Sequence, residues 1–340
     1  MTQQKLVVLD AATYGDVSLR ILSDRWDCTI HQLTTPAELG QRLKRQSVAV
    51  TNKVVMDRTV LSSPAAQELK LIAVAATGTD IIDREAAKEI GITVCNVPGY
   101  ATQSVAQFTL ALILELATRA GRYGLAVHSD AWQQSPVFTL LDFPSVELSG
   151  KKLGIIGYGN IGRAVAEMAR GFGLEVMIAA RPGSIGPIRS GRVPLPELFR
   201  QADVITLHCP LTPQTKNLIN AETLSLMKPT ALLINTARGA LIDETALIQA
   251  LREKRLAAAA LDVISREPPP ADHPIIQATK ELDNLLVTPH TAWSARESRE
   301  RLLKEVANNI SAFFEGQPRN IVCRARCPAG PRCTGQPQDP

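Results

Sequence analysis

Short apolar runs rich in β-branched residues alternate with helical patterns along most of the chain, and this alternation constrains the fold more than any other feature. A strand, a helix and a second strand in succession are typical of a mostly parallel sheet with helices packed on its faces. The first hundred residues contain five such runs, a number suited to a small doubly wound sheet of the flavodoxin type. They lie at residues 6–9, 28–30, 48–50, 71–75 and 92–95.

A second series of six runs follows and predicts a Rossmann sheet. The runs lie at 153–156, 175–179, 204–207, 231–235, 258–262 and 285–288. An almost entirely apolar helix is expected over 104–120, and an amphipathic helix over 297–314 is expected to rejoin the first sheet. The fold class is therefore α/β with two doubly wound parallel-sheet domains. One comprises residues 1–99 and 293–320 and is flavodoxin-like, and the other comprises residues 100–292 and is of the Rossmann type. Residues 321–340 are predicted to be a disordered tail.

Composition excludes several classes of protein. The 340 residues are 45% hydrophobic and 21% charged, as in a soluble globular protein, and the net charge of +4 comes without long basic runs, so no nucleic-acid partner is expected. The most apolar long stretch, 100–114, is too short and polar to cross a membrane, and the amino terminus does not resemble a secretion signal. The cysteines lack zinc-ligand spacing, so no metal is expected. These features favour a cytoplasmic protein.

A glycine-rich turn, GYGNIG at 157–162, directly follows the predicted strand 153–156 and begins a helical pattern. In this context the first glycine permits the tight turn, the second lets the backbone approach a pyrophosphate, and the third lets helix and strand pack closely. Phosphates bind at such a helix N-terminus because its N–H groups and dipole favour anions. The motif therefore predicts a dinucleotide site at Gly157, Gly159, Asn160, Ile161 and Gly162.

The following predicted strand ends without the acidic residue that usually binds the ribose 2′-hydroxyl of NAD. Arg181 occupies this region, with Ser184 nearby in a glycine-containing turn. A guanidinium forms charge-assisted bonds to phosphate oxygens, so Arg181 favours NADP over NAD, although a solvated loop arginine would look the same in the sequence.

Three polar residues follow strands of the second series, where ligands of open α/β sheets bind. Reduction of a 2-keto acid needs a cation for the carboxylate and carbonyl oxygens, a proton donor, and a group that keeps the donor protonated. Arg238, His290 and Glu267 match these needs in that order, and Asp262 is a candidate acceptor for the nicotinamide carboxamide. Each alone is also explained as a surface charge, a core histidine or a turn residue. Their joint position after parallel strands favours a site.

Several of these segments resemble the D-isomer-specific 2-hydroxyacid dehydrogenases, and the resemblance extends from about residue 5 to residue 314. The matching motifs are AATGTD at 75–80, NVPGY at 96–100, the glycine-rich turn, HCPLT at 208–212, NTARG at 235–239, ALDV at 260–263 with Glu267-Pro268, and PHTAW at 289–293.

The resemblance implies that Arg238 binds the substrate and polarises its carbonyl, and that His290 is the acid/base oriented by Glu267. It implies that backbone N–H groups of Thr77 and Gly78 bind the substrate carboxylate, which would make the first domain the substrate domain and the second the cofactor domain, with the site in the cleft between them. It also places Thr236 and Ala237 among the contacts to the cofactor.

Within the family, residues 51–55, 132–143 and 290–293 are most similar to glycerate dehydrogenases, also called hydroxypyruvate reductases. This implies hydroxypyruvate and D-glycerate, or glyoxylate and glycolate, as substrates, with Lys53 as a further substrate contact, and a homodimer formed through the 104–120 helix and the segment near Trp132. The alternatives are a cofactor-sensing binding protein or corepressor on the same fold, or a dehydrogenase of another small acid such as phosphite. Formate is disfavoured because Glu267 stands where formate enzymes resemble one another in having an amide.

Overall fold

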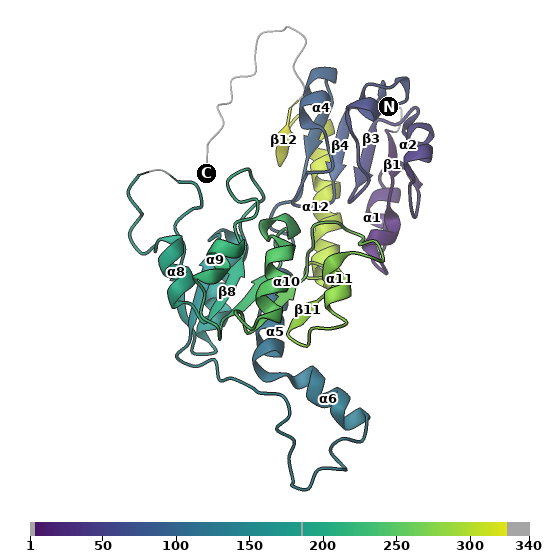
Figure 1. Cartoon of the computed structure of the whole chain (residues 1–340). Coiled ribbons are helices and arrows are strands. Elements are labelled where there is room, and N and C mark those ends of the chain that lie inside the picture. The colour runs from purple at the N-terminus through teal and green to yellow at the C-terminus, as the bar shows by residue number, and fades with distance from the viewer. Residues whose placement is uncertain (1–3, 185, 325–340) are drawn as a thin grey trace. The chain divides into compact units, whose positions relative to one another are not determined.

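The computed structural model describes residues 4–184 and 186–324. Contacts between residues divide the chain into two compact units (Figure 1). The first contains residues 1–100 and 296–340, and the second contains residues 101–295. Each unit is described below by itself.

The first unit contains a parallel sheet in the strand order β5-β4-β3-β1-β2, which is the flavodoxin order predicted from the sequence. Its strands are β1 (Lys5–Val8), β2 (Asp27–Ile30), β3 (Val48–Thr51), β4 (Leu71–Val74) and β5 (Thr93–Cys95). Its helices are η1 (Ala11–Tyr14), α1 (Arg20–Ser23), α2 (Pro36–Leu43), α3 (Arg58–Leu61), η2 (Pro64–Ala66), α4 (Arg84–Ile90) and α12 (Arg296–Phe314). Strands β3, β4 and β5 are buried along their whole length, as expected of parallel strands covered on both faces.

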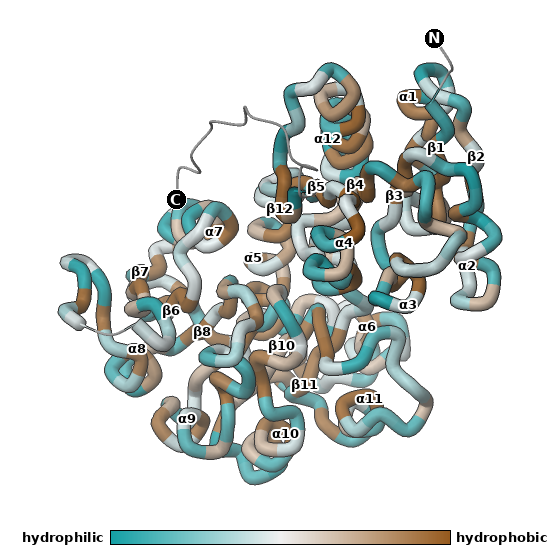
Figure 2. Tube along the Cα trace, turned by 90° about the horizontal axis from the view of Figure 1, so that it is seen from above, coloured by the Kyte–Doolittle hydropathy of each residue, from teal (hydrophilic) through white to brown (hydrophobic). Residues whose placement is uncertain are grey.

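Helix α12 returns to this sheet and packs on β4 and α1. Figure 2 shows hydrophobic and hydrophilic residues alternating along it, which is the pattern of a helix with one buried face. That face carries Leu302, Leu303, Val306 and Ile310.

The predicted disordered tail is wrong at its beginning. Ile321–Cys323 form a further strand, β12, which pairs antiparallel with β5 at the edge of the first sheet. The reason lies in tertiary structure: the exposed edge of β5 offers unpaired backbone groups, and the short apolar sequence that follows α12 satisfies them while burying Cys323. The prediction for residues 325–340 lies outside the described residues.

The second unit contains a six-stranded parallel sheet in the order β11-β10-β9-β8-β6-β7. Its strands are β6 (Lys152–Ile156), β7 (Glu175–Ile178), β8 (Val204–Leu207), β9 (Leu232–Asn235), β10 (Ala258–Leu261) and β11 (Leu285–Val287). Next to β7, one parallel bridge pairs Ala179 with Val193. In a Rossmann sheet an outer strand occupies this position. The predicted doubly wound architecture is therefore confirmed, with that outer strand reduced to one bridge.

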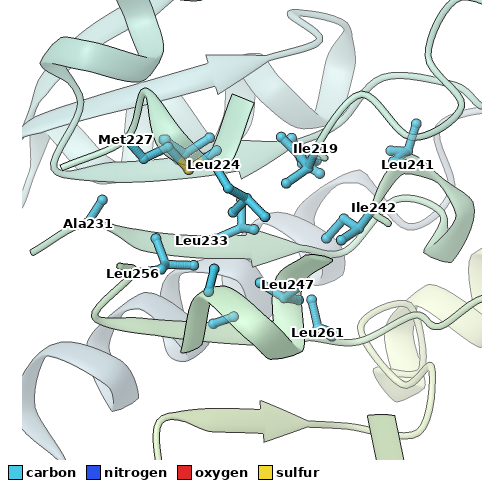
Figure 3. Packing of buried hydrophobic residues seen from close by; sticks show 14 of the residues in the cluster. Ile219, Leu224, Met227, Ala231, Leu233, Leu241, Ile242, Leu247, Leu256 and Leu261 are labelled. Carbon is cyan, nitrogen blue, oxygen red and sulfur yellow. The ribbon is translucent and has the colours of Figure 1, made fainter. Parts of the chain in front are cut away.

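Helices cover both faces of this second sheet. The helices of this unit are α5 (Thr102–Thr118), α6 (Ala120–His128), α7 (Asn160–Arg170), α8 (Leu195–Gln201), α9 (Ala221–Ser225), η3 (Gly239–Leu241), α10 (Glu244–Arg252) and α11 (Pro274–Ala278). Of these, α6 has no buried residue. One core includes Ile219, Leu224, Leu233, Leu247 and Leu261, which Figure 3 shows at close range. The second core joins α5 and α7 to the sheet, so α5 is the multiply buried helix that its sequence predicted. No helix in the described part of the chain is long and apolar enough to cross a membrane.

The strand order positions the functional loops. In the second sheet the chain moves to opposite sides of β6, toward β7 first and toward β8 afterwards, so the loops after β6 and β8 meet at a topological switch point. In the first sheet the same reversal occurs between β1 and β3. Ligand sites in such sheets lie at the carboxyl ends of the strands at these points.

Candidate active site

The turn between β6 and α7 has the geometry of a phosphate cradle. Gly157 has φ of 98°, and an added Cβ there would lie 2.4 Å from backbone atoms of His208 and Cys209. A Cβ on Gly162 would lie 2.1 Å from the carbonyl oxygen of Gly157. On Gly159, by contrast, a Cβ would meet nothing within 4 Å. The first and third glycines therefore permit close packing, and the second leaves open space directly before the helix.

This open space fits a dinucleotide pyrophosphate. Asn160 begins α7 and is exposed beside Gly159. The first N–H groups of an α-helix have no partner within the helix, and they lie at the positive end of its dipole. The described residues of this turn thus offer donors, a favourable field and room for an anion.

At the end of β7, residues 181–184 form a tight turn in which Ser184 donates its backbone N–H and its hydroxyl to the carbonyl oxygen of Arg181. A second cation, Arg192, lies near this edge: its Nη1 donates to Ala179 O at 3.0 Å, and its guanidinium lies 5.2 Å from the ring centroid of Tyr158. Arg192 therefore connects the end of β7 to the glycine-rich turn.

The loop after β8 places a histidine against the same turn. Burial lowers the pKa of His208 to about 4, so the ring is neutral at physiological pH. Its Nε2 is buried and has no hydrogen-bond partner among the described residues. The backbone of His208 and Cys209 leaves Gly157 no room for a side chain.

The loop after β9 carries Arg238 and is organised by Asn235, the last residue of the strand. The buried Asn235 amide donates to the carbonyl oxygen of Arg238 at 2.9 Å and accepts the Ala237 N–H at 3.0 Å. The hydroxyl of Thr236 lies 3.0 Å from that of Thr109 on α5. The loop is thus held from the sheet and from a helix, and the half-buried Arg238 extends from a constrained backbone.

His290 and Glu267 form a close pair. The distance from His290 Nδ1 to Glu267 Oε2 is 2.5 Å, and both side chains are partly exposed. The other carboxylate oxygen of Glu267 accepts the Ile264 N–H at 3.0 Å. His290 has φ of 54°, in the left-handed region that costs free energy for a residue with a side chain. Its backbone N–H donates to Asp262 O at 2.8 Å, which helps to hold this conformation.

Asp262 supports the His290 loop as well. Its Oδ1 accepts from the Thr288 hydroxyl at 2.7 Å and from Thr291 N–H at 2.9 Å, and its Oδ2 accepts from Ala292 N–H at 2.9 Å. Burial raises the pKa of Asp262, and these donors act against that effect. Because a carboxylate oxygen can accept two hydrogen bonds, Oδ2 retains capacity for a second donor beside Ala292 N–H.

In the first unit, the candidate substrate residues follow β3 and β4. Thr77 donates its hydroxyl to Val97 O at 3.0 Å, and Gly78 follows it in a partly exposed loop. Lys53 is exposed and donates its backbone N–H to Asp10 Oδ2 at 2.6 Å. Asp10 also binds the Asn52 N–H at 3.0 Å, and burial raises its pKa despite these bonds. The Asp10 carboxylate therefore holds the loop that presents Lys53.

Comparison with known proteins decides the family. The model of the D-isomer specific 2-hydroxyacid dehydrogenase NAD binding domain matches residues 110–292. The chain belongs to this family. It is 40% identical to a glycerate dehydrogenase from Methylorubrum extorquens over 94% of this chain and 99% of the relative. It is 38% identical to a hydroxypyruvate reductase from Blautia hydrogenotrophica, again over 94% of this chain and 99% of the relative. A solved acyclic imino acid reductase in complex with NADPH and D-Arg has a TM-score of 0.80 and 29% identity, covering 94% of this chain and 100% of that one.

This dehydrogenase is thus an NAD(P)-dependent oxidoreductase of 2-hydroxy acids, as its sequence predicted. The structure brings the predicted pair His290 and Glu267 into contact. Arg238 follows β9, which is the neighbour of β10 in the sheet, and Glu267 follows β10. No group of three or more His, Cys, Asp or Glu side chains suited to a metal ion occurs within residues 4–184 and 186–324.

Sequence reasoning missed three residues of this dehydrogenase. Asn235 was read only as part of a motif, although a buried amide at the end of a strand signals a loop that needs side-chain hydrogen bonds. Asp10 has the same signal at the end of β1. Arg192 carries no local signal, because its contacts with Ala179 and Tyr158 depend on how the chain returns to β7.

Proposed function

We propose that this dehydrogenase reduces hydroxypyruvate to D-glycerate, and glyoxylate to glycolate, with NADPH as the preferred reductant. The contact between His290 and Glu267 at 2.5 Å carries the proposal, because it supplies an oriented proton donor. The names of the two relatives, a glycerate dehydrogenase and a hydroxypyruvate reductase, support the choice of acid.

The proposed chemistry uses Arg238, His290 and Glu267. The guanidinium of Arg238 binds the carboxylate and the carbonyl oxygen of the keto acid and polarises the C2 carbonyl. The nicotinamide, when bound, supplies the hydride that reduces C2. Since Nδ1 of His290 is engaged by Glu267, Nε2 is the nitrogen that donates a proton to the developing alkoxide oxygen. The Glu267 carboxylate orients the ring through its contact with Nδ1.

The cofactor contacts follow from the cradle. Gly157, Gly159, Asn160, Ile161 and Gly162 would hold the pyrophosphate, and Thr236 and Ala237 would line the path toward the nicotinamide. Asp262 Oδ2, which has room for another donor, would accept from the carboxamide. In the first unit, Thr77, Gly78 and Lys53 would bind the substrate carboxylate.

NADPH preference rests on two cations at the end of β7. Arg181 lies in the position usually taken by an acid, and Arg192 is already held by Ala179 O and the Tyr158 ring. Either guanidinium can bind the 2′-phosphate of NADPH. Neither can accept a hydrogen bond from the ribose 2′-hydroxyl of NADH, as a carboxylate does. Steady-state rates with NADH and NADPH, repeated with Arg181→Asp, test this preference. Preference for NADH that the substitution leaves unchanged contradicts it.

The activity itself is tested by following NADPH oxidation with hydroxypyruvate, glyoxylate and a panel of other 2-keto acids. Arg238→Ala should abolish turnover while the thermal unfolding temperature stays near that of the wild type. A protein that binds NADPH but turns over none of these acids would instead be a cofactor-sensing binding protein.

We also propose a cytoplasmic homodimer with no nucleic-acid partner. Large apolar side chains lie exposed in the segment after α6, including Phe138 at 89% and Leu141 at 80% exposure. An apolar patch of this kind is typical of an interface between subunits. Light scattering coupled to gel filtration gives the mass, and a monomer that persists at micromolar concentration contradicts the proposal.

A further inference from the structure

The loop that carries Glu267 is also held at Ser265, by groups from two other elements of the second unit. Glu244, the first residue of α10, accepts the Ser265 backbone N–H at Oε1 (2.7 Å) and the Ser265 hydroxyl at Oε2 (2.8 Å). His273, directly before α11, lies with Nε2 3.3 Å from Ser265 Oγ and 3.7 Å from Glu244 Oε2.

Burial of these polar side chains costs free energy, because it removes them from water. The side chains of Glu244 and His273 are 13% and 5% exposed, respectively. A carboxylate with so little access to water is retained when hydrogen bonds and nearby cations compensate its lost hydration. Capping of α10 does not account for Glu244, because Asp243 is the N-cap and accepts the Ala246 N–H.

The cluster is mechanically joined to the acid/base pair. Ser265 precedes Glu267 by two residues, and Glu267 Oε1 accepts the N–H of Ile264 at 3.0 Å. The position of the Glu267 carboxylate therefore depends on the backbone at Ile264 and Ser265. Gly239, which follows Arg238, packs on the same peptide: an added Cβ would lie 2.0 Å from Ile264 C and 2.5 Å from Ser265 N.

The side chains Ser265, His273 and Glu244 do not form a nucleophilic triad. A nucleophilic serine donates its proton to a histidine whose other nitrogen is oriented by a third group. Here Glu244 accepts the Ser265 hydroxyl directly, and His273 Nδ1 is buried without a hydrogen-bond partner among the described residues. The arrangement restrains a loop and does not activate an oxygen.

We propose that Glu244 is a positioning residue for catalysis, acting through Ser265 with His273 packed against both. By holding the loop after β10, Glu244 keeps the Glu267 carboxylate in contact with His290. It also keeps the Arg238 loop packed against the peptide between Ile264 and Ser265. The inference rests on the proposed roles of Glu267 and His290 in proton transfer.

The test compares Glu244→Ala, Glu244→Gln and the matched control Glu222→Ala, which removes an exposed glutamate from the first turn of α9. Displacement of a catalytic group by about 1 Å costs up to about a hundredfold in rate, so Glu244→Ala should lower kcat with hydroxypyruvate about tenfold to a hundredfold. The loss should fall on kcat, as in Glu267→Gln, while the KM for hydroxypyruvate and the NADPH Kd stay within about twofold of the wild type. Glu244→Gln keeps an acceptor for Ser265 N–H and should recover most of kcat, and Glu222→Ala should match the wild type.

A lowered unfolding temperature for Glu244→Ala with unchanged kcat, or a loss of kcat matched by an equal change in KM, would refute the positioning role. If Glu244→Ala does not fold, Ser265→Ala, which removes only the hydroxyl bonds, should show a smaller effect in the same direction, and wild-type behaviour there also refutes it. NMR chemical shifts of the His290 ring, recorded at one pH, separate the two proposals, because they report the contact with Glu267 without turnover. Absence of activity in the wild type rejects the proposed function, and identical His290 ring chemical shifts in wild type and Glu244→Ala reject the inference.

Discussion

Two glycine-to-alanine substitutions in the glycine-rich turn should have different effects. One lowers the free energy of unfolding, and the other lowers the affinity for NADPH. Gly162→Ala places a Cβ 2.1 Å from Gly157 O, well inside ordinary contact distance, so helix and strand must separate by about 1 Å or more. Overpacking costs about 1–3 kcal/mol, and the backbone oxygen here cannot rotate away, so the upper end applies. The better helix propensity of alanine returns about 1 kcal/mol. We expect a net loss of about 2 kcal/mol in the free energy of unfolding.

Gly159→Ala differs in its mechanism. Its φ of −81° suits any residue, and its Cβ would meet nothing within 4 Å, so the free energy of unfolding should change by less than about 0.5 kcal/mol. The methyl group would occupy the space proposed for the pyrophosphate, so NADPH affinity should fall about tenfold or more. Urea unfolding gives the stabilities, and fluorescence quenching by NADPH gives Kd. Wild-type stability in Gly162→Ala, or wild-type NADPH affinity in Gly159→Ala, would refute this account of the turn.

Three further predictions concern charge and buried polar groups. Glu267→Gln should lower kcat about tenfold to a hundredfold, because a neutral amide replaces the carboxylate that engages His290 Nδ1 and orients its ring; a wild-type kcat speaks against the pair. His208 has a pKa near 4 in the folded chain and 6.5 in the unfolded chain. The free energy of unfolding should therefore be at its full value above pH 6.5 and should fall by about 3 kcal/mol as the pH falls toward 4. Urea unfolding of His208→Gln should show a weaker loss over this range, and the same slope as wild type would contradict the assignment. Asn235→Ala removes two hydrogen bonds, so it should lower the free energy of unfolding by about 2–3 kcal/mol and should lower kcat. A fully active and equally stable variant would show that the Arg238 loop keeps its conformation without Asn235.

The central strands were predictable because parallel strands buried on both faces must be continuously apolar. Val204–Leu207 has the predicted bounds, and the other predicted strands differ from the structure by one or two residues at their ends. Ile321–Cys323 was mispredicted because only three residues are apolar, and what makes them a strand is the open edge of β5. The glycine roles were predictable because each follows from what a Cβ would contact in a strand–turn–helix unit.

The sequence by itself determined the two doubly wound sheets, the glycine-rich turn and the candidates for the acid/base pair, since alternating apolar runs and residues at strand ends are local information. Only the tertiary structure showed that Glu244 and His273 hold Ser265, that Asp262 holds the His290 loop, and that Arg192 lies on Tyr158. Apart from the contact between Ser265 and His273, these contacts join residues that are separated by at least one whole helix or strand. Their partners are chosen by packing in three dimensions, which no local pattern of residues encodes.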